Sequence, residues 1–240
     1  KFGIPNLFSQ DLLDEAGRMA RQALGQGRED LRHLPIVAID PVDARDFDDA
    51  VWASPRDDGG FDAIVAIADV SFYVRPHSLL DKEARKRGNS VYFPDRVVPM
   101  LPEELSADIC SLRAGEDRAA LACHMVIDKD GQLKSWRFSR AVIKVAANIP
   151  YEDAQAAMDG EKPHDLLEPA LKPLWACWAL LAKARDKREP LDLDLPERRV
   201  VLDENGRIMS VAPRARLDAH RLIEDFMIAA NVAAAKALEG

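Results

Sequence analysis

The sequence predicts an α+β (mixed α/β) fold in which an antiparallel-rich sheet packs against helices. Three turn-rich stretches, at 57–60, 128–131 and 203–206, are each flanked by apolar segments. Apolar runs on both sides of a short Asp- and Gly-containing turn are typical of β-hairpins, whose strands pair antiparallel. Other segments carry apolar residues at i, i+3 and i+4 spacing, which indicates amphipathic helices. We expect one domain built from these elements.

Short apolar runs and the turns beside them predict the strands. The run LPIVAID at 34–40 is short and apolar, which predicts a buried strand that ends in an acidic loop. The hairpin strands are expected at 50–53 with 61–70, 121–128 with 132–145, and 198–203 with 207–212.

The expected helices alternate with the hairpins. A Ser/Asp start and a Gly just beyond the apolar pattern predict a helix over 9–24. Further helices are expected over 78–87, 164–188 and 216–239. The stretch 88–120 contains Pro94, Pro99 and Pro102 and is expected to be ordered loop or extended chain.

Composition limits the class of protein. The 240 residues carry a formal net charge of −8, which argues against nucleic-acid binding by overall positive charge but leaves room for a local basic groove. No apolar run reaches membrane-spanning length, so we expect no membrane association. The three cysteines are widely spaced among apolar neighbours, which predicts buried reduced thiols and a cytoplasmic protein.

Five aspartates crowd into one ten-residue stretch: Asp40, Asp43, Asp46, Asp48 and Asp49. Two like charges about 4 Å apart repel by roughly 4 kcal/mol at an effective dielectric near 20. Such a cluster weakens a fold unless a cation offsets the repulsion or the side chains point apart into water. Carboxylate ligands without His or Cys suit a hard ion such as Mg²⁺ or Mn²⁺.

Two structural explanations compete with a metal site. The stretch could be a solvated turn, or a helix N-terminus with Asp40 as cap and Pro41 at the first position. Neither accounts for Ile39, Phe47 and Val51, which draw the segment against a core. An EF-hand is excluded because its ligand spacing and central Gly are missing. The pattern therefore favours a divalent-cation site.

The stretch IDPVDARDFDDAV at 39–51 resembles the signature of the ribonuclease II/ribonuclease R (RNB) family. The resemblance continues in order through IADVSFYVRP (67–76), RKRGNSVYFPDRVVPMLPEELS (85–106), CSLR (110–113) and HRLIEDFMIAAN (220–231), and is closer to ribonuclease R. It implies the RNB catalytic-domain fold and a Mg²⁺-dependent 3′-to-5′ exoribonuclease, for which Mn²⁺ is an alternative ion. The expected substrate is single-stranded RNA, and the expected products are nucleoside 5′-monophosphates.

The resemblance also assigns roles within the acidic cluster. Asp40, Asp46, Asp48 and Asp49 match the four active-site aspartates of the family. Asp40 and Asp49 are then direct metal ligands, Asp46 assists them, and Asp48 is indispensable to the chemistry. Asp43 belongs to the longer ribonuclease R form of the motif and is expected to lie in the loop beside the site.

Three further residues are expected to bind RNA. Tyr92 matches a family aromatic that stacks on the 3′-terminal bases, although the residues alone would favour core packing. Tyr151 matches a tyrosine that lines the RNA path. Six basic residues lie around these motifs: Lys82, Arg85, Lys86, Arg87, Arg96 and Arg113. They form either a solvated surface or contacts to RNA phosphates, and we assign Arg113 to RNA binding. His220 and Glu224 lie one helical turn apart. We interpret this pair as part of a polar helix face and not as a second metal site.

The sequence departs from the family in several places. Asn148 stands where the family has an arginine, and the segment 191–197 lacks the second aromatic of the family's base clamp. We expect residues 1–240 to contain neither the cold-shock and S1 domains that the family resemblance implies nor the arginine segment that completes the family's catalytic domain. We therefore expect residues 1–240 to form the N-terminal part of an RNB catalytic domain, with no obligate protein partner.

Two alternatives to an active exoribonuclease remain open. The chain could bind RNA without turnover because the C-terminal arginine segment is missing. It could also be a structural domain whose acidic loop is only a turn.

Overall fold

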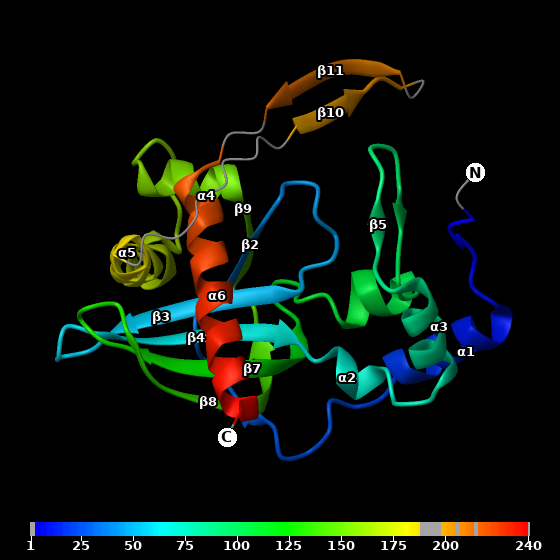
Figure 1. Ribbon diagram of the computed structural model, residues 1–240, viewed down its shortest axis with the longest axis horizontal. Coiled ribbons are helices and arrows are strands. Elements are labelled where there is room, and N and C mark those ends of the chain that lie inside the picture. The colour runs from blue at the N-terminus through cyan, green and yellow to red at the C-terminus, as the bar shows by residue number, and fades with distance from the viewer. Residues whose placement is uncertain (1–2, 188–197, 205–206, 214–215, 240) are drawn as a thin grey trace. The chain divides into compact units, whose positions relative to one another are not determined.

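The computed structural model describes residues 3–187, 198–204, 207–213 and 216–239, and the chain divides into two compact units (Figure 1). The sheet unit comprises residues 24–69, 110–191 and 217–240. The hairpin unit comprises residues 1–23, 70–109 and 192–216.

A seven-stranded sheet with the order β1-β8-β7-β4-β3-β2-β9 organises the sheet unit. Its central pairings are antiparallel, whereas β1 pairs with β8 and β2 with β9 in parallel. The strands are β1 Glu29–Asp30, β2 Val37–Asp40, β3 Asp49–Pro55, β4 Phe61–Ala68, β7 Asp117–Ile127, β8 Leu133–Lys144 and β9 Ala147–Pro150. The predicted antiparallel-rich sheet is confirmed.

Two of the predicted hairpins form the middle of this sheet. β3 and β4 pair along their whole length, and β7 pairs with β8 across the turn at 128–131. Gly131 has φ +76°, and a Cβ there would lie 2.1 Å from the backbone oxygen of Leu180. Only glycine allows this turn to approach the neighbouring helix so closely.

The described residues of the sheet unit form three α-helices: α4 Tyr151–Met158, α5 Lys172–Asp186 and α6 Asp218–Glu239. Figure 1 shows α6 crossing the sheet, and it contacts β4, β7 and β8. Apolar side chains from the strands and helices meet in one core: Val37, Ile39, Val51, Val65, Met125, Ile149, Leu171, Leu174, Leu222 and Phe226. Burial of this size is the main stabilising contribution to such a unit.

The predicted helix ends differ from the observed ones. The helix predicted at 216–239 is confirmed as α6, but α5 begins at Lys172 because a π-helical turn, η2, occupies Leu167–Leu171. Strands β1 and β9 and helix α4 were not predicted. These strands have two and four residues, which is too short for an apolar period to stand out.

The hairpin unit contains short helices and two small hairpins. Its elements are α1 Gln10–Ala20, α2 Val70–Tyr73, α3 Leu79–Arg87, β5 Val91–Tyr92, β6 Val97–Val98, η1 Glu104–Ile109, β10 Arg198–Leu202 and β11 Ile208–Pro213. α1 packs against α3 and η1, and Leu12, Tyr73 and Leu105 are buried. The predicted α1 and α3 helices are confirmed, although α1 ends at Ala20 instead of 24.

The stretch 88–120 is more structured than predicted. It forms the β5–β6 hairpin, the π-helical segment η1 and the first residues of β7. The prolines lie outside the strands and η1, so they limit these elements without preventing them. The third predicted hairpin, β10–β11, is confirmed but forms a separate two-stranded sheet.

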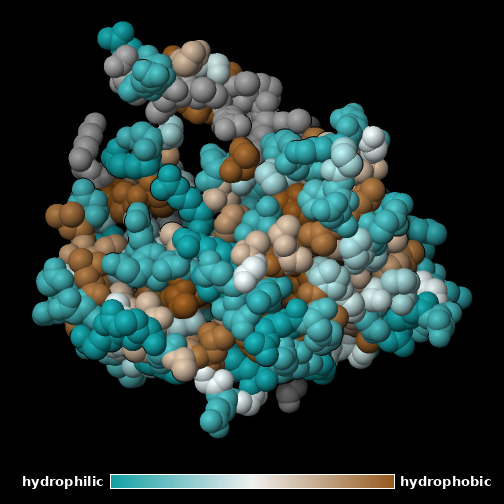
Figure 2. Space-filling model, turned by 180° about the vertical axis from the view of Figure 1, so that it is seen from behind, coloured by the Kyte–Doolittle hydropathy of each residue, from teal (hydrophilic) through white to brown (hydrophobic). Residues whose placement is uncertain are grey.

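The surface and the cysteines agree with the composition. Hydrophilic residues predominate in Figure 2, and apolar residues appear in scattered groups. All three cysteines are free and buried, as predicted. Among the described residues, no helix combines the length and the apolar character that crossing a bilayer requires.

Candidate functional site

The acidic loop joins two adjacent strands of the sheet unit. Asp40 is the last residue of β2, and Asp49 is the first residue of β3. Because β2 and β3 pair antiparallel, these two carboxylates lie at the same end of the strand pair. The buried neighbours Ile39 and Ala50 fix both strand ends against the core.

Residues 41–48 form a loop and not a helix, so the helix-cap explanation of Asp40 is wrong. The amide of Ala44 donates to the carbonyl of Pro41 at 2.9 Å, which closes a turn that contains the exposed Asp43. The carbonyl of Asp48 accepts from the amide of Ala68, at the end of β4. Asp43 therefore lies in the turn, while Asp48 is attached to the sheet.

Burial and mutual repulsion raise the pKa values of aspartates in the acidic cluster. Burial raises the pKa of Asp40 to about 7, and the charges of Asp49, Asp48 and Asp46 contribute to the rise. Burial, with the charge of Asp48, raises the pKa of Asp49 to about 6. The pKa of Asp48 is also raised, by burial first and then by Asp46. These four aspartates thus act on one another, as expected for a site that needs a counter-charge.

One carboxylate oxygen is left without compensation. Oδ2 of Asp40 is buried and makes no hydrogen bond to any residue that the structure describes. A buried, unpaired carboxylate oxygen is costly unless a cation or a donor reaches it. The all-carboxylate donor set fits Mg²⁺ or Mn²⁺ chemically. Within the described parts of the chain, however, no three His, Cys, Asp or Glu side chains are already arranged to hold an ion.

Tyr151 stands beside the acidic loop in the topology. Pro150 of β9 pairs with Asp40, and Tyr151 follows as the first residue of α4. The ring of Tyr151 stacks on His220 of α6, with centroids 4.0 Å apart. The structure therefore connects a predicted RNA-binding residue with the strand that carries Asp40.

Arg113 lies in a short segment, residues 110–114, that hydrogen-bonds to the acidic loop at Arg45 and Phe47. Asn148 holds this segment from both sides of Arg113, because its Oδ1 accepts from the amide of Ala114 at 2.8 Å and its Nδ2 donates to the carbonyl of Leu112 at 3.0 Å. Asn148 thus contacts backbone on both sides of Arg113.

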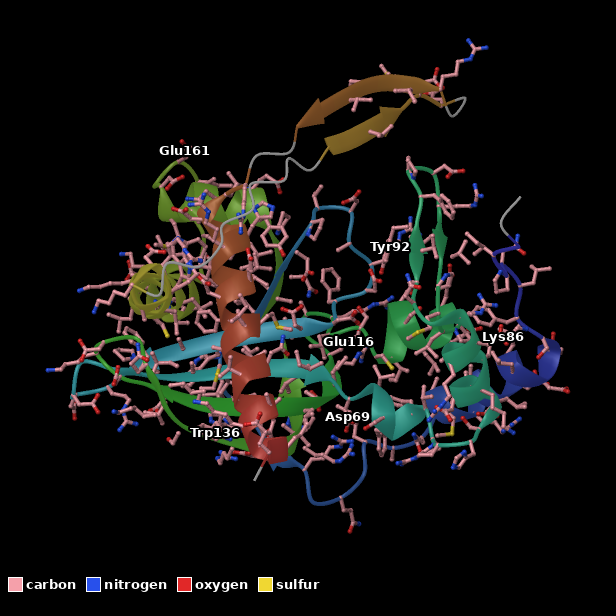
Figure 3. The ribbon with its side chains drawn as sticks, viewed as in Figure 1. Asp69, Lys86, Tyr92, Glu116, Trp136 and Glu161 are labelled. Carbon is pink, nitrogen blue, oxygen red and sulfur yellow. The ribbon has the colours of Figure 1, made fainter. Side chains whose placement is uncertain are left out.

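Tyr92 belongs to the hairpin unit. It lies on β5 and is 63% exposed, so the core-packing explanation of this residue is wrong (Figure 3).

In the basic run, Arg87 is structural, since its buried guanidinium pairs with Glu83 at 2.9 Å and lies over the ring of Phe8. The segment 191–197, in which the family resemblance predicts a second clamp aromatic that the sequence lacks, lies outside the described residues.

The RNB domain family model matches residues 28–240. The chain belongs to this family. The match covers the acidic loop, the segment 110–114 and the tyrosines Tyr92 and Tyr151.

Curated RNB relatives are longer than this chain. Ribonuclease R of Vibrio parahaemolyticus is 46% identical over 217 residues, which cover 89% of this chain and 26% of the relative. Ribonuclease R of Escherichia coli is 43% identical over 219 residues, covering 89% of this chain and 27% of the relative. The chain therefore spans about a quarter of the length of the curated relatives it matches.

A solved RNB structure has the same fold. RNase R of Mycoplasma genitalium, in complex with ribose-methylated single-stranded RNA, superimposes with a TM-score of 0.90 at 28% identity. The similarity covers 95% of this chain and 36% of that one. The RNB catalytic-domain fold predicted from the sequence is thereby confirmed.

One residue at the site was missed by sequence reasoning. Ser111 is fully buried, and its hydroxyl contacts the backbone of the acidic loop. The only signal in the sequence was its place in the CSLR segment, which carries the family resemblance but gives no role to a serine.

Proposed function

We propose that this chain contributes the metal-binding part of a 3′-to-5′ exoribonuclease that acts on single-stranded RNA. The observation that carries the proposal is the buried, uncompensated Oδ2 of Asp40 among three interacting aspartates. Relatives named Ribonuclease R support the reaction class.

In this proposal, Asp40 and Asp49 hold Mg²⁺ or Mn²⁺ directly, and Asp46 assists them. The side chains must turn toward a common point to do so, since the described residues hold no ready-made ligand group. When bound, the ion supplies charge neutralisation at the phosphodiester and activation of a water molecule. Asp48, fixed by its backbone to Ala68, presents its carboxylate to the reacting phosphate and water.

RNA recognition falls to aromatic and basic side chains. The RNA-bound structure of M. genitalium RNase R supports RNA as the ligand class. Tyr92 offers an exposed ring, and base–aromatic stacking tolerates any sequence. Tyr151 and Arg113 contribute contacts beside the acidic loop. Contacts of these kinds would let a chain whose net charge is −8 bind RNA without an overall positive charge.

A nuclease assay with 5′-labelled single-stranded RNA tests the proposal. With Mg²⁺ we expect a ladder of shortened RNA together with nucleoside 5′-monophosphates, and a chelator should stop both. Internal fragments without mononucleotides would contradict an exonuclease.

RNA binding without turnover is the second candidate. It is supported by the similarity to an RNase R structure solved in complex with RNA, which bears on binding and not on turnover. In the same assay it predicts RNA that is retarded on a native gel but intact. RNA that is neither bound nor shortened would contradict both candidates and favour a structural domain.

A further inference from the structure

A single buried hydroxyl holds the acidic loop on both sides of Asp46. Oγ of Ser111 accepts a hydrogen bond from the amide of Phe47 at 3.0 Å and donates one to the carbonyl of Arg45 at 3.1 Å. These two backbone groups belong to the residues immediately before and after Asp46. The serine therefore fixes both peptide neighbours of one proposed site residue.

The segment that carries Ser111 is itself held firmly. The amide of Leu112 donates to the carbonyl of Phe47 at 2.8 Å. Nε of Arg118, which is buried, donates to the carbonyl of Ser111 at 2.9 Å. Ser111 is 0% exposed, so water does not compete for its hydroxyl. The hydroxyl is thus presented to the loop from a fixed base.

The acidic loop has no helix and no strand over residues 41–48. Its other backbone hydrogen bonds to described residues are the bond from Leu112 to Phe47, the turn at Pro41–Ala44 and the bond from Ala68 to Asp48. Loss of the Ser111 hydroxyl would leave the amide of Phe47 and the carbonyl of Arg45 without this partner. These two partly buried backbone groups would then turn to other partners, and the peptides on both sides of Asp46 would shift with them.

We infer that Ser111 is a positioning residue that sets the place of Asp46 in the metal site through the backbone of Arg45 and Phe47. The inference rests on the proposed function of the acidic loop. Groups that orient metal ligands from outside the coordination sphere commonly change metal affinity by 10–100-fold when removed. A serine that merely fills the core would affect stability alone.

The test compares three variants with the wild-type protein. Ser111→Ala removes the hydroxyl, and Ser111→Thr keeps it. Ser139→Ala is the matched control, because the Ser139 hydroxyl also bridges side chains in the sheet unit, donating to Glu29 at 2.6 Å, but does so away from the acidic loop. If Ser111→Ala does not fold, Ser111→Cys replaces it, since a thiol fills a similar volume as a weak donor.

Three quantities are measured for each variant: Mn²⁺ affinity by calorimetry, kcat and KM for single-stranded RNA, and Tm. For Ser111→Ala we expect Mn²⁺ affinity and kcat to fall by about 10–100-fold, with KM within about threefold of wild type. Ser111→Thr should stay within about threefold in Mn²⁺ affinity and kcat. Ser139→Ala should lower Tm and leave Mn²⁺ affinity unchanged.

The outcomes separate the two claims. The positioning role is overturned if Ser111→Ala lowers Tm, as Ser139→Ala does, but leaves Mn²⁺ affinity at the wild-type value. A wild-type protein that binds Mn²⁺ but never shortens RNA contradicts the proposed exoribonuclease, and the Mn²⁺ titration still decides the role of Ser111. A wild-type protein that binds no Mn²⁺ overturns the metal site and this inference together.

Discussion

The ring of Tyr151 lies nearly parallel to the imidazole of His220, with an interplanar angle of 15° and centroids 4.0 Å apart. The stack ties the first turn of α4 to the first turn of α6, so one face of the tyrosine is already covered. RNA would then meet the other face or the edge of the ring. His220 accordingly supports a proposed RNA-binding residue and need not be a metal ligand.

A double-mutant cycle tests this support. Tyr151→Ala and His220→Ala should each weaken RNA binding, and the double variant should lose little more than Tyr151→Ala alone. Stacked aromatic pairs contribute about 0.5–1.5 kcal/mol beyond their area, which sets the expected coupling energy. RNA affinity is measured by fluorescence anisotropy. Strictly additive losses would show that the two rings act independently.

Asp48→Asn should separate turnover from binding. The amide keeps the shape of the side chain but removes the charge that we assign to the reaction. We expect kcat to fall at least about 100-fold, the scale on which one stabilising group at a reaction centre acts. The Kd for single-stranded RNA should stay within about threefold of wild type. Undiminished turnover would remove Asp48 from the proposed mechanism.

The acidic loop should make the metal-free protein less stable as the pH rises. The pKa of Asp40 is about 7 and that of Asp49 about 6, whereas both lose their protons near pH 4 in the unfolded chain. Between these values the folded state holds more protons than the unfolded state. The free energy of unfolding contributed by these groups therefore falls as pH rises from about 4 to about 7.

A divalent cation should reverse this loss, because it binds the deprotonated carboxylates. We expect Mn²⁺ to raise Tm slightly near about pH 5 and most above about pH 7. Thermal unfolding with and without Mn²⁺ across this range is the measurement. In the control, Asp40→Asn with Asp49→Asn should flatten the pH dependence and abolish the Mn²⁺ shift. A Tm increase that does not depend on pH would point to binding elsewhere.

Local patterns predicted the elements that are long or bounded by strong turns. The hairpins β3–β4 and β7–β8 and helix α6 have apolar periods of many residues and clear Gly-containing turns. Strand β9 has four residues and gains its place by pairing with β2, which a local pattern cannot reveal. The prolines of 88–120 predicted loop or extended chain, but the two-residue strands β5 and β6 form between them, and strands this short leave no local pattern.

The candidate site likewise has a part that local sequence predicts and a part that only the fold brings together. The acidic residues are adjacent in the sequence, so their clustering was evident, and the apolar residues around them correctly indicated partial burial. The contributions of Ser111 and Asn148 depend on contacts across 64 to 66 and 34 to 36 positions. Neither residue type carries a signal of its own for such a role. Only the fold brings them to the loop.

Tyr92 should matter for RNA binding but not for stability. Its side chain is largely exposed on β5, so Tyr92→Ala removes little buried surface and should leave Tm nearly unchanged. Loss of one stacking contact costs about 1–3 kcal/mol, or roughly 5- to 150-fold in RNA affinity. Tyr92→Phe keeps the ring and should bind RNA as wild type does. Equal binding by Tyr92→Ala would refute the stacking role.

Asp225 should matter for stability but not for chemistry. This carboxylate is 5% exposed on α6 and accepts from Nε1 of Trp178 at 2.8 Å and from Arg185 at 2.7 Å, both on α5. Removing one partner of a buried ion pair costs about 3–5 kcal/mol. Asp225→Ala should therefore lower the free energy of unfolding by about that amount in urea titrations.

The same arginine provides the matched control for Asp225. Asp186 also pairs with Arg185, but its side chain is 70% exposed, and exposed pairs contribute at most about 1 kcal/mol. Asp186→Ala should consequently change stability little. Below the unfolding transition, both variants should keep the Mn²⁺ affinity of the wild type, because the described hydrogen bonds and ion pairs of both carboxylates are to residues of α5. An equal loss of stability in the two variants would mean that burial does not determine the strength of the Asp225 pair.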